Sequence, residues 1–335
     1  MGFRARALAV IKVLIPALLI AAQGALLLLF TYRWVGTSAL TIIPFWAYGI
    51  IALAASLLCL AILRNGFSIA AALIWLATLL TCPDEMAGLA RIWHEAPAPG
   101  TPALAADNVQ PLRVVTLNCR KHNLKCLDVI KEWQPDIILL QESPYRSYLS
   151  KLATDLYGKD GGMIAMPSWD CAIVARGKIT VRQTAPYFTQ AKVELANGRS
   201  VEVVSLHLHG AATSLSLHRR KTWQLHTTSR QVRLAEMANI HQSILKYAPY
   251  RTCIIGGDFN SPAGDRVYFS LRNNNFTDSF RTTGKGWGDT VMSRYPVHRI
   301  DQIWASSDTL RPIRSRTVTT EHSDHKMVVS DFVWK

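Results

Sequence analysis

The sequence predicts an α/β domain in which two mixed sheets pack face to face with helices outside, preceded by a membrane segment. Two observations support this prediction. From about residue 112 onward, apolar strand patterns alternate with helical patterns and with hairpin signals, whereas residues 1–83 carry almost no charge. The 335-residue chain is 49% hydrophobic with a net charge of +14, and both properties are unevenly distributed along it.

Three apolar stretches within residues 1–83 are candidate membrane helices. They cover residues 13–30, 39–63 and 66–82, and the third is barely long enough, because a helix needs about 17–25 apolar residues to cross a bilayer. A signal peptide that is later removed is the alternative, but three successive apolar stretches argue against it. We therefore expect about three transmembrane helices.

Basic residues in the short loops predict the orientation of these helices. Arg4, Arg6 and Lys12 precede the first stretch and Arg64 separates the second from the third, which places both loops in the cytoplasm. Arg33 lies on the opposite side and is the exception. Three crossings put the rest of the chain outside the cytoplasm, and losing the third crossing would reverse this.

The remainder of the chain is expected to form a linker and one folded domain. Residues 84–111 are rich in Ala and Pro, which is typical of a semi-rigid linker. Residues 112–335 contain 31 of the 37 Lys and Arg residues and 19 of the 23 Asp and Glu residues, which gives a net charge of +12. This charge favours phosphate-rich partners such as nucleic acid or anionic lipid headgroups. Alternatively, it only holds the domain near an anionic membrane.

The first elements of the domain predict a βαβ unit. Residues 112–118 and 136–140 have the apolar pattern of strands, and residues 123–133 between them have helical spacing. Strands in such a unit are parallel and usually adjacent, so Asn118 and Glu142 are expected at the same edge of a sheet. An acid that merely begins a helix before Pro144 is the alternative for Glu142.

A hairpin and a long basic helix are expected next. Residues 191–195 and 200–208 flank the sequence Ala-Asn-Gly-Arg, which is a strong hairpin signal, and the second strand ends at His207. His209 follows closely and is the alternative to His207 as a functional histidine. Residues 217–247 have a mostly helical pattern that begins with the basic residues Arg219, Arg220 and Lys221.

The stretch after this helix has the strongest functional signal. An apolar run at residues 253–255 stops at two glycines that are followed by Asp258, Phe259 and Asn260. Open α/β sheets bind ligands just past the carboxyl ends of their strands. A carboxylate and a carboxamide two positions apart suit a phosphate oxygen, an attacking water and a hard cation. An ordinary Gly-Asp-x-Asn turn is the alternative.

Two further groups lie where the last strands begin. Asp301 stands near the start of a strand at residues 299–305, and Asp324 and His325 precede a final strand at residues 327–334. These groups can share one edge with the earlier ones only if the last strands run antiparallel to the first. Asp301 has a structural alternative as a buried strand acid, but such an acid needs a partner, and His325 is the obvious one.

Six short motifs in this order give the chain a family resemblance. It resembles the endonuclease/exonuclease/phosphatase superfamily through Thr116-Leu117-Asn118, Gln141-Glu142, Ser205-Leu206-His207-Leu208, Gly257-Asp258-Phe259-Asn260, Arg299-Ile300-Asp301 and Ser323-Asp324-His325. The resemblance covers residues 112–335 and leaves out the membrane segment. It implies a four-layer α/β/β/α sandwich of two mixed sheets, preceded here by an N-terminal transmembrane helical segment.

The resemblance also implies an activity and a set of roles. It implies Mg²⁺- or Mn²⁺-dependent hydrolysis of a phosphate ester. Glu142 would be the principal metal ligand, supported by Asn118 and Asp324. The catalytic residues would be Asp258 and Asn260, which orient the attacking water, His325 with Asp301 as its orienting partner, and His207, which contacts the phosphoryl oxygens. Cys119 and Arg120 follow Asn118 where many relatives place another acid or amide, so the branch of the family and the number of metals stay open.

The substrate and the cellular location are expectations as well. A membrane-anchored nuclease is the leading hypothesis, with Arg219, Arg220 and Lys221 as substrate-binding residues. A lipid or small-molecule phosphoesterase is the first alternative, and a catalytically silent membrane scaffold is the second. Together with the loop charges, the resemblance to bacterial members predicts an integral protein of a bacterial inner membrane with a periplasmic catalytic domain.

Overall fold

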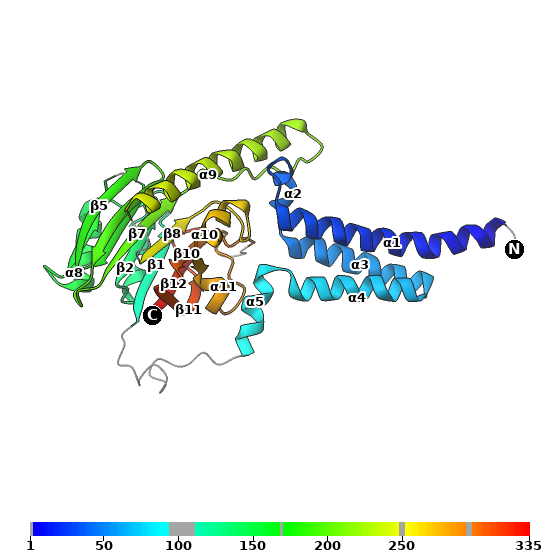
Figure 1. Cartoon of the computed structure of the whole chain (residues 1–335), viewed down its shortest axis with the longest axis horizontal. Helices are drawn as coiled ribbons and strands as arrows, with labels where there is room; N and C mark the ends of the chain where they lie inside the picture. The colour runs from blue at the N-terminus through cyan, green and yellow to red at the C-terminus, as the bar shows by residue number, and fades with distance from the viewer. Residues whose placement is uncertain (1–2, 94–110, 168–169, 248–251, 293–296) are drawn as a thin grey trace. The chain divides into compact units, whose positions relative to one another are not determined.

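The computed structural model describes residues 3–93, 111–167, 170–247, 252–292 and 297–335. The chain forms two compact units. The membrane-helix unit consists of residues 1–87 and 212–228, and the α/β unit consists of residues 88–211 and 229–335. The two units differ in kind, since the first is helical and the second is built on two sheets (Figure 1).

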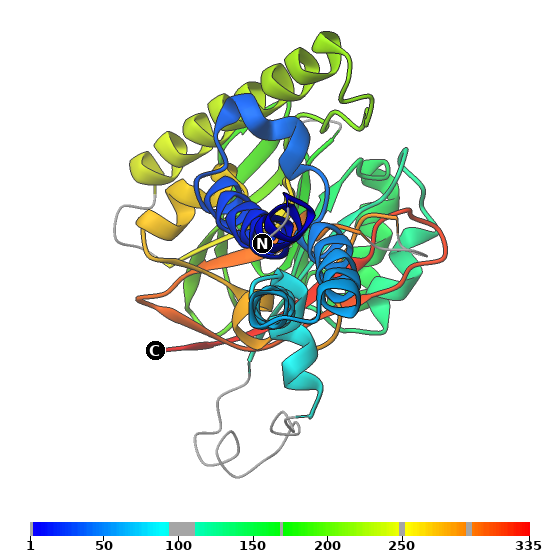
Figure 2. The ribbon, with the colours of Figure 1, turned by 90° about the vertical axis from the view of Figure 1, so that its right-hand side faces the viewer.

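Three long helices make up most of the membrane-helix unit and pack alongside one another (Figure 2): α1 (Phe3–Tyr32), α3 (Phe45–Leu63) and α4 (Gly66–Thr81). The short helices η1 (Val35–Thr37) and α2 (Ser38–Thr41) connect α1 to α3. Residues Val10–Tyr32 and Phe45–Leu63 are each long and apolar enough to cross a membrane. Helix α4 meets the same test only together with Asp84–Trp93, across a bend of 73°, so the described residues contain two candidate spans, or up to three.

Polar groups within this unit contact one another, while apolar side chains face outward. Asn65 Nδ2 donates to the backbone oxygen of Lys12 at 2.9 Å, and Trp75 Nε1 donates to that of Leu19 at 3.1 Å, which ties α4 to α1. Ile51 on α3 is 70% exposed, as expected for a side chain that faces lipid. The apolar outer surface therefore suits a bilayer rather than water.

The segment expected to be a linker begins as helix. Residues Asp84–Ala90 form α5 and Arg91–Trp93 form η2. The rest of the segment, residues 94–110, lies outside the described residues.

Twelve strands among the described residues form two six-stranded mixed sheets. The first sheet has the order β11 (Leu310–Val318), β12 (Met327–Trp334), β1 (Leu112–Asn118), β2 (Ile137–Gln141), β4 (Ala172–Arg176) and β3 (Gly162–Ala165). The second has the order β5 (Lys178–Ala185), β6 (Phe188–Glu194), β7 (Ser200–His207), β8 (Cys253–Asp258), β10 (Asp301–Ser306) and β9 (Phe276–Asp278). Strands β1 and β2 are parallel, as the βαβ pattern predicts.

Apolar residues divide the α/β unit into four layers. One core cluster lies between the sheets and includes Leu139 and Ile254. A second lies beneath α7 (Cys126–Lys131) and α8 (Arg146–Tyr157), and a third joins the second sheet to the later part of α9 (Arg220–Tyr247). Each fully buried Leu or Ile contributes about 1.5–3 kcal/mol. The predicted class, an α/β sandwich of two mixed sheets preceded by membrane-type helices, is therefore confirmed.

The short elements near the end of the chain complete the unit. They are η3 (Arg266–Tyr268), α10 (Phe269–Asn273) and α11 (Ser279–Thr283). The first two follow each other without a break over residues 266–273.

Candidate active site

The parallel pairing of β1 and β2 positions the first two polar groups. Asn118, the last residue of β1, is opposite Gln141, so Glu142 follows directly at the same edge. Asn118 Nδ2 donates to Glu142 Oε1 at 3.2 Å, and the backbone N–H of Lys121 donates to Glu142 Oε2 at 2.6 Å. Glu142 itself has a φ of 45°, which is costly for a residue with a side chain and is most often tolerated at functional sites.

Strand β8 positions the groups of the second sheet. Its last residue, Asp258, is opposite His207 in the parallel strand β7 and opposite Asp301 in the antiparallel strand β10. Strand β12 is likewise antiparallel to β1, so residues just before β12 lie near the end of β1. The last strands thus have the direction that a single shared edge requires.

Gly257 explains why a double glycine precedes Asp258. Its φ is +150°, and a Cβ atom there would lie 1.9 Å from the backbone oxygen of Leu206. A side chain at this position would push β8 away from β7 and displace the carboxylate that follows.

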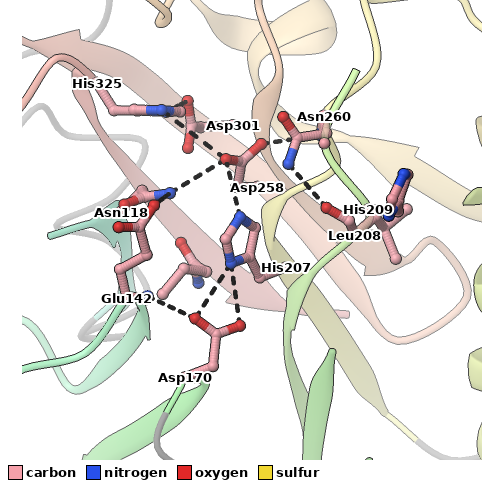
Figure 3. A network of polar contacts seen from close by, with 12 residues as sticks. Asn118, Glu142, Asp170, His207, Leu208, His209, Asp258, Asn260, Asp301 and His325 are labelled. Carbon is pink, nitrogen blue, oxygen red and sulfur yellow. Dashed lines mark hydrogen bonds and ion pairs between the residues drawn. The ribbon is translucent and has the colours of Figure 1, made fainter. Parts of the chain in front are cut away.

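Asp258 lies at the centre of the polar network in Figure 3. Its Oδ2 accepts from Asn118 Nδ2 at 3.2 Å, and its Oδ1 accepts from the backbone N–H of Asn260 at 2.8 Å. The Nε2 atoms of His207 and His325 approach Oδ2 to 3.7 and 3.9 Å. Because Asn118 belongs to the first sheet and Asp258 to the second, this network joins the two sheets at one edge. Burial, and then the charge of Asp301, raises the pKa of Asp258.

His325 and Asp301 form the first of two histidine–carboxylate pairs. The Nδ1–Oδ2 distance is 2.9 Å, and both residues are buried. Burial by itself would lower the pKa of His325, but the charge and the hydrogen bond of Asp301 raise it to about 10. The imidazole is therefore protonated at neutral pH, with its Nε2–H on the side of Asp258.

His207 forms the second pair with Asp170, a residue that the sequence-based prediction missed. His207 Nδ1 lies 3.0 Å from Asp170 Oδ2, and Asp170 Oδ1 also accepts from the backbone N–H of Glu142 at 3.1 Å. Burial opposes the charge on the imidazole, but the hydrogen bond to Asp170 and the charge of Asp258 raise the pKa of His207 to about 9. Burial raises the pKa of Asp170, but the hydrogen bond and charge of His207, together with the backbone N–H of Glu142, lower it overall. The sequence signal for Asp170 was an acid just before β4. Because β4 is antiparallel to β2, a residue before β4 lies near the end of β2, where Glu142 follows.

Asn260 supports the site through the backbone. Its Nδ2 donates to the backbone oxygen of Leu208 at 2.7 Å, and its φ is 47°. The bond connects the loop after β8 to the end of β7. His209 lies beyond Leu208 in Figure 3, and His207 is the histidine that contacts Asp258.

The donor set of the site fits a divalent cation. Ligand atoms of Asp258, Asp301 and His325 lie within 4.8 Å of one another, and Asp301 Oδ1 is buried without a hydrogen-bond partner among the described residues. Glu142 adds a further carboxylate, whose Oε1 accepts from the same Asn118 Nδ2 that donates to Asp258. Carboxylate and amide oxygens are the ligands that hard divalent cations prefer.

Four of the expected residues have other surroundings. Asp324 is half exposed, and its Oδ1 lies 3.6 Å from Arg120 Nε. Arg219, Arg220 and Lys221 are exposed and belong to the membrane-helix unit. The structure thus brings together the other seven: Asn118, Glu142, His207, Asp258, Asn260, Asp301 and His325.

The fold and this site define a class of protein, and comparisons with known proteins agree. Residues 115–325 match the endonuclease/exonuclease/phosphatase family, and the chain belongs to this family. Members of the family are phosphoesterases that typically use divalent metals, so the domain is a hydrolase of phosphate esters by class. No curated protein matches the sequence significantly.

Solved structures show the same fold at low sequence identity. The human Nocturnin catalytic domain with bound sulfate anion is 19% identical, with a TM-score of 0.51 over 67% of this chain and 94% of that chain. An endonuclease/exonuclease/phosphatase from Bacteroides vulgatus is 17% identical, with a TM-score of 0.50 over 68% of this chain and all of that chain. A family protein from Bacteroides thetaiotaomicron is 15% identical with the same TM-score and coverage.

Proposed function

We propose that this protein is a membrane-anchored, divalent-metal-dependent phosphodiesterase, and most specifically a nuclease. The observation that carries the proposal is the convergence of two histidine–carboxylate pairs on Asp258, with the Asn118–Glu142 pair beside it. Phosphodiester hydrolysis needs groups that orient a water in line with the leaving oxygen and groups that offset developing negative charge. This arrangement offers both.

The two imidazoles supply positive charge and protons. With pKa values of about 9 and 10, His207 and His325 hold protons on Nε2 at neutral pH. Each can donate a hydrogen bond to a phosphoryl oxygen, and one can pass its proton to the leaving oxygen. Asp170 and Asp301 fix the ring orientations and stabilise the charged imidazoles, so they act as positioning residues.

Asp258 and Asn260 are the groups that we assign to the attacking water. Asp258 Oδ2 lies between the two histidines and can accept a proton from a water in that position. The raised pKa of Asp258 makes its carboxylate a better proton acceptor than an exposed aspartate. The backbone N–H of Asn260 holds Oδ1 in place.

The cation is proposed to be Mg²⁺ or Mn²⁺, held chiefly by Glu142, with Asn118 beside it and the half-exposed Asp324 as a further ligand. Such a cation, when bound, offsets the charge of the phosphate and lowers the pKa of a bound water. His325 is protonated and already bonded to Asp301, so taking it as a ligand requires loss of that proton. The cation is therefore expected near Glu142, where the carboxylate of Glu142 and the amide of Asn118 lie together.

Two features bear on the substrate. The net charge of +12 over residues 112–335 favours nucleic acid. The membrane-type helices instead favour a lipid or small-molecule phosphoester, which is the second candidate. A silent scaffold is the third, and the converging histidine–carboxylate pairs count against it. The proposed location is a bacterial inner membrane with the catalytic domain in the periplasm, which fusions of a topology reporter to the carboxyl terminus would test.

The experiment that tests the function uses the full chain in lipid nanodiscs. It would be incubated with Mg²⁺ or Mn²⁺ and with single-stranded DNA, duplex DNA, RNA, sphingomyelin or inositol phosphates. We expect metal-dependent cleavage of nucleic acid that is lost in Glu142→Ala and kept in Glu132→Ala. Glu132 is an exposed acid that precedes β2, whereas Glu142 follows it. Cleavage of lipid or small phosphoesters alone would establish the second candidate. A folded protein that cleaves none of these substrates would support the third candidate, a catalytically silent membrane scaffold.

A further inference from the structure

A basic segment in the middle of the chain belongs to the membrane-helix unit, although about 120 residues separate it from those helices in the sequence. Residues 212–228 form one compact unit with residues 1–87. The segment contains Arg219, Arg220 and Lys221 and no acidic residue. All three basic side chains are exposed. A cluster of exposed positive charges therefore lies within the unit that carries the candidate membrane spans.

Apolar side chains flank the three basic residues. Leu215 is 64% exposed and Leu225 is 51% exposed. Lys221 and Leu225 are one helical turn apart in α9, so they share a face of that helix. Surfaces that contact nucleic acid present basic, polar and aromatic groups, whereas segments at a membrane surface combine basic residues with exposed Leu or Trp.

Contacts of other side chains hold the segment in shape, and the basic side chains add only an exposed bond from Arg219 Nε to His218 Nε2 at 3.3 Å. Trp223 Nε1 donates to the backbone oxygen of Leu217 at 2.7 Å, and His226 Nε2 lies 2.8 Å from the backbone oxygen of Ser214. These bonds fold the chain before α9 back onto the first turns of the helix. The segment is therefore a preformed surface with leucines and basic groups outward.

We propose that residues 212–228 are a second membrane contact, which binds the anionic phosphate headgroups of the bilayer in which the helices are anchored. Arg219, Arg220 and Lys221 pair with the headgroups, and Leu215 and Leu225 enter the boundary between headgroups and acyl chains. The contact fixes the start of α9 at the bilayer surface. The inference rests on the proposed anchoring of the chain and is independent of the substrate.

The test places a fluorescent label on the full chain in nanodiscs that contain nitroxide-headgroup lipid as a quencher. Labels go on cysteines introduced at Leu215, at Ile51 in α3 and at Val181 in β5, in a Cys82→Ser background, because Cys82 is the one exposed cysteine. In separate nanodiscs that contain lipid with a nitroxide on the acyl chain, quenching of the label at Ile51 reports that the chain is anchored. Failure of the anchor is thereby distinguished from failure of the segment. The label at Val181 is the reference for a site on the α/β unit.

We expect the label at Leu215 to be quenched more than the label at Val181, and more in phosphatidylglycerol-containing discs than in pure phosphatidylcholine. Changing Arg219, Arg220 and Lys221 to Gln together should remove this difference, with about a fivefold loss in the contact equilibrium for each charge. Equal quenching at Leu215 and Val181, or quenching that ignores lipid charge, would overturn the proposal. So would a triple variant that keeps its quenching but binds a labelled oligonucleotide with a weaker salt dependence, because the segment would then contact nucleic acid.

Discussion

His325 and Asp301 form a buried pair whose Nδ1–Oδ2 distance is 2.9 Å, and the other ring nitrogen of His325 faces Asp258. Two strands of different sheets bring these residues together. Asp301 begins β10 in the second sheet, and His325 precedes β12 in the first sheet. The pair fixes both the orientation and the charge of the imidazole. It is therefore the place where a small change should affect catalysis more than folding.

Replacing Asp301 with Asn should lower kcat by about 10²–10⁴-fold, because an amide neither stabilises the imidazolium nor selects its orientation. The measurement is steady-state hydrolysis with the substrate identified in the nanodisc assay. Asp331→Asn is the matched control, since Asp331 is a buried carboxylate paired with Arg113 at 2.7 Å. It should lower the thermal stability of the domain and leave kcat of the folded protein within a few-fold. Equal losses of kcat in the two variants would contradict the role of Asp301.

The pair of His207 and Asp170 should make stability depend on pH. The folded pKa of His207, about 9, is raised above the unfolded value of about 6.5, so its contribution is fully present below pH 6.5 and is lost as the pH rises to 9. The shift corresponds to roughly 3 kcal/mol. We expect Asp170→Asn to destabilise the metal-free protein at pH 6 and to have a smaller effect at pH 9.5. Thermal unfolding of the wild-type protein and the variant at both pH values, in detergent with a chelator, measures this difference. An equal loss of Tm at pH 6 and at pH 9.5 would exclude the ion pair.

Binding of Mn²⁺ should release few protons at pH 7 if Glu142 is the principal ligand. Because His325 has a pKa of about 10, a cation that took it as a ligand would release close to one proton. Calorimetry in buffers of different ionisation enthalpy gives the number of protons released. Glu142→Gln should weaken Mn²⁺ binding at least tenfold, and Asp324→Asn, which changes a half-exposed acid, should weaken it less. Release of a full proton would contradict Glu142 as the principal ligand and would assign the cation to Asp258, Asp301 and His325.

Gly257→Ala should destabilise the domain by at least about 2 kcal/mol, because the new Cβ meets the backbone of β7 in a conformation that side chains rarely adopt. For a domain of this size, that corresponds to a lower Tm by roughly 4–8 °C. Gly210→Ala is the control, since an added Cβ there meets no atom within 4 Å. An unchanged Tm in Gly257→Ala would show that β8 can shift without cost.

The sequence determined the strands that carry the site. Apolar runs at β1, β2 and β8 end in polar residues at definite positions, and a short run of this kind is typical of a buried strand. Asn118, Glu142, His207, Asp258 and Asn260 could therefore be placed at strand ends from local pattern and family motifs. Strand β5 was missed because it is an edge strand whose residues are mostly polar and none of which is buried, and such strands have little apolar signal.

The tertiary structure decided which groups meet. Asp170 follows no motif, and its role depends on the antiparallel pairing of β4 with β2, which is a relationship between strands about 30 residues apart. The same holds for Arg219, Arg220 and Lys221, whose charge is plain in the sequence but whose membership in the membrane-helix unit is not. Local pattern specifies each segment because burial and periodicity act over a few residues. Neighbours across sheets and units depend on contacts between distant segments, which only the folded chain defines.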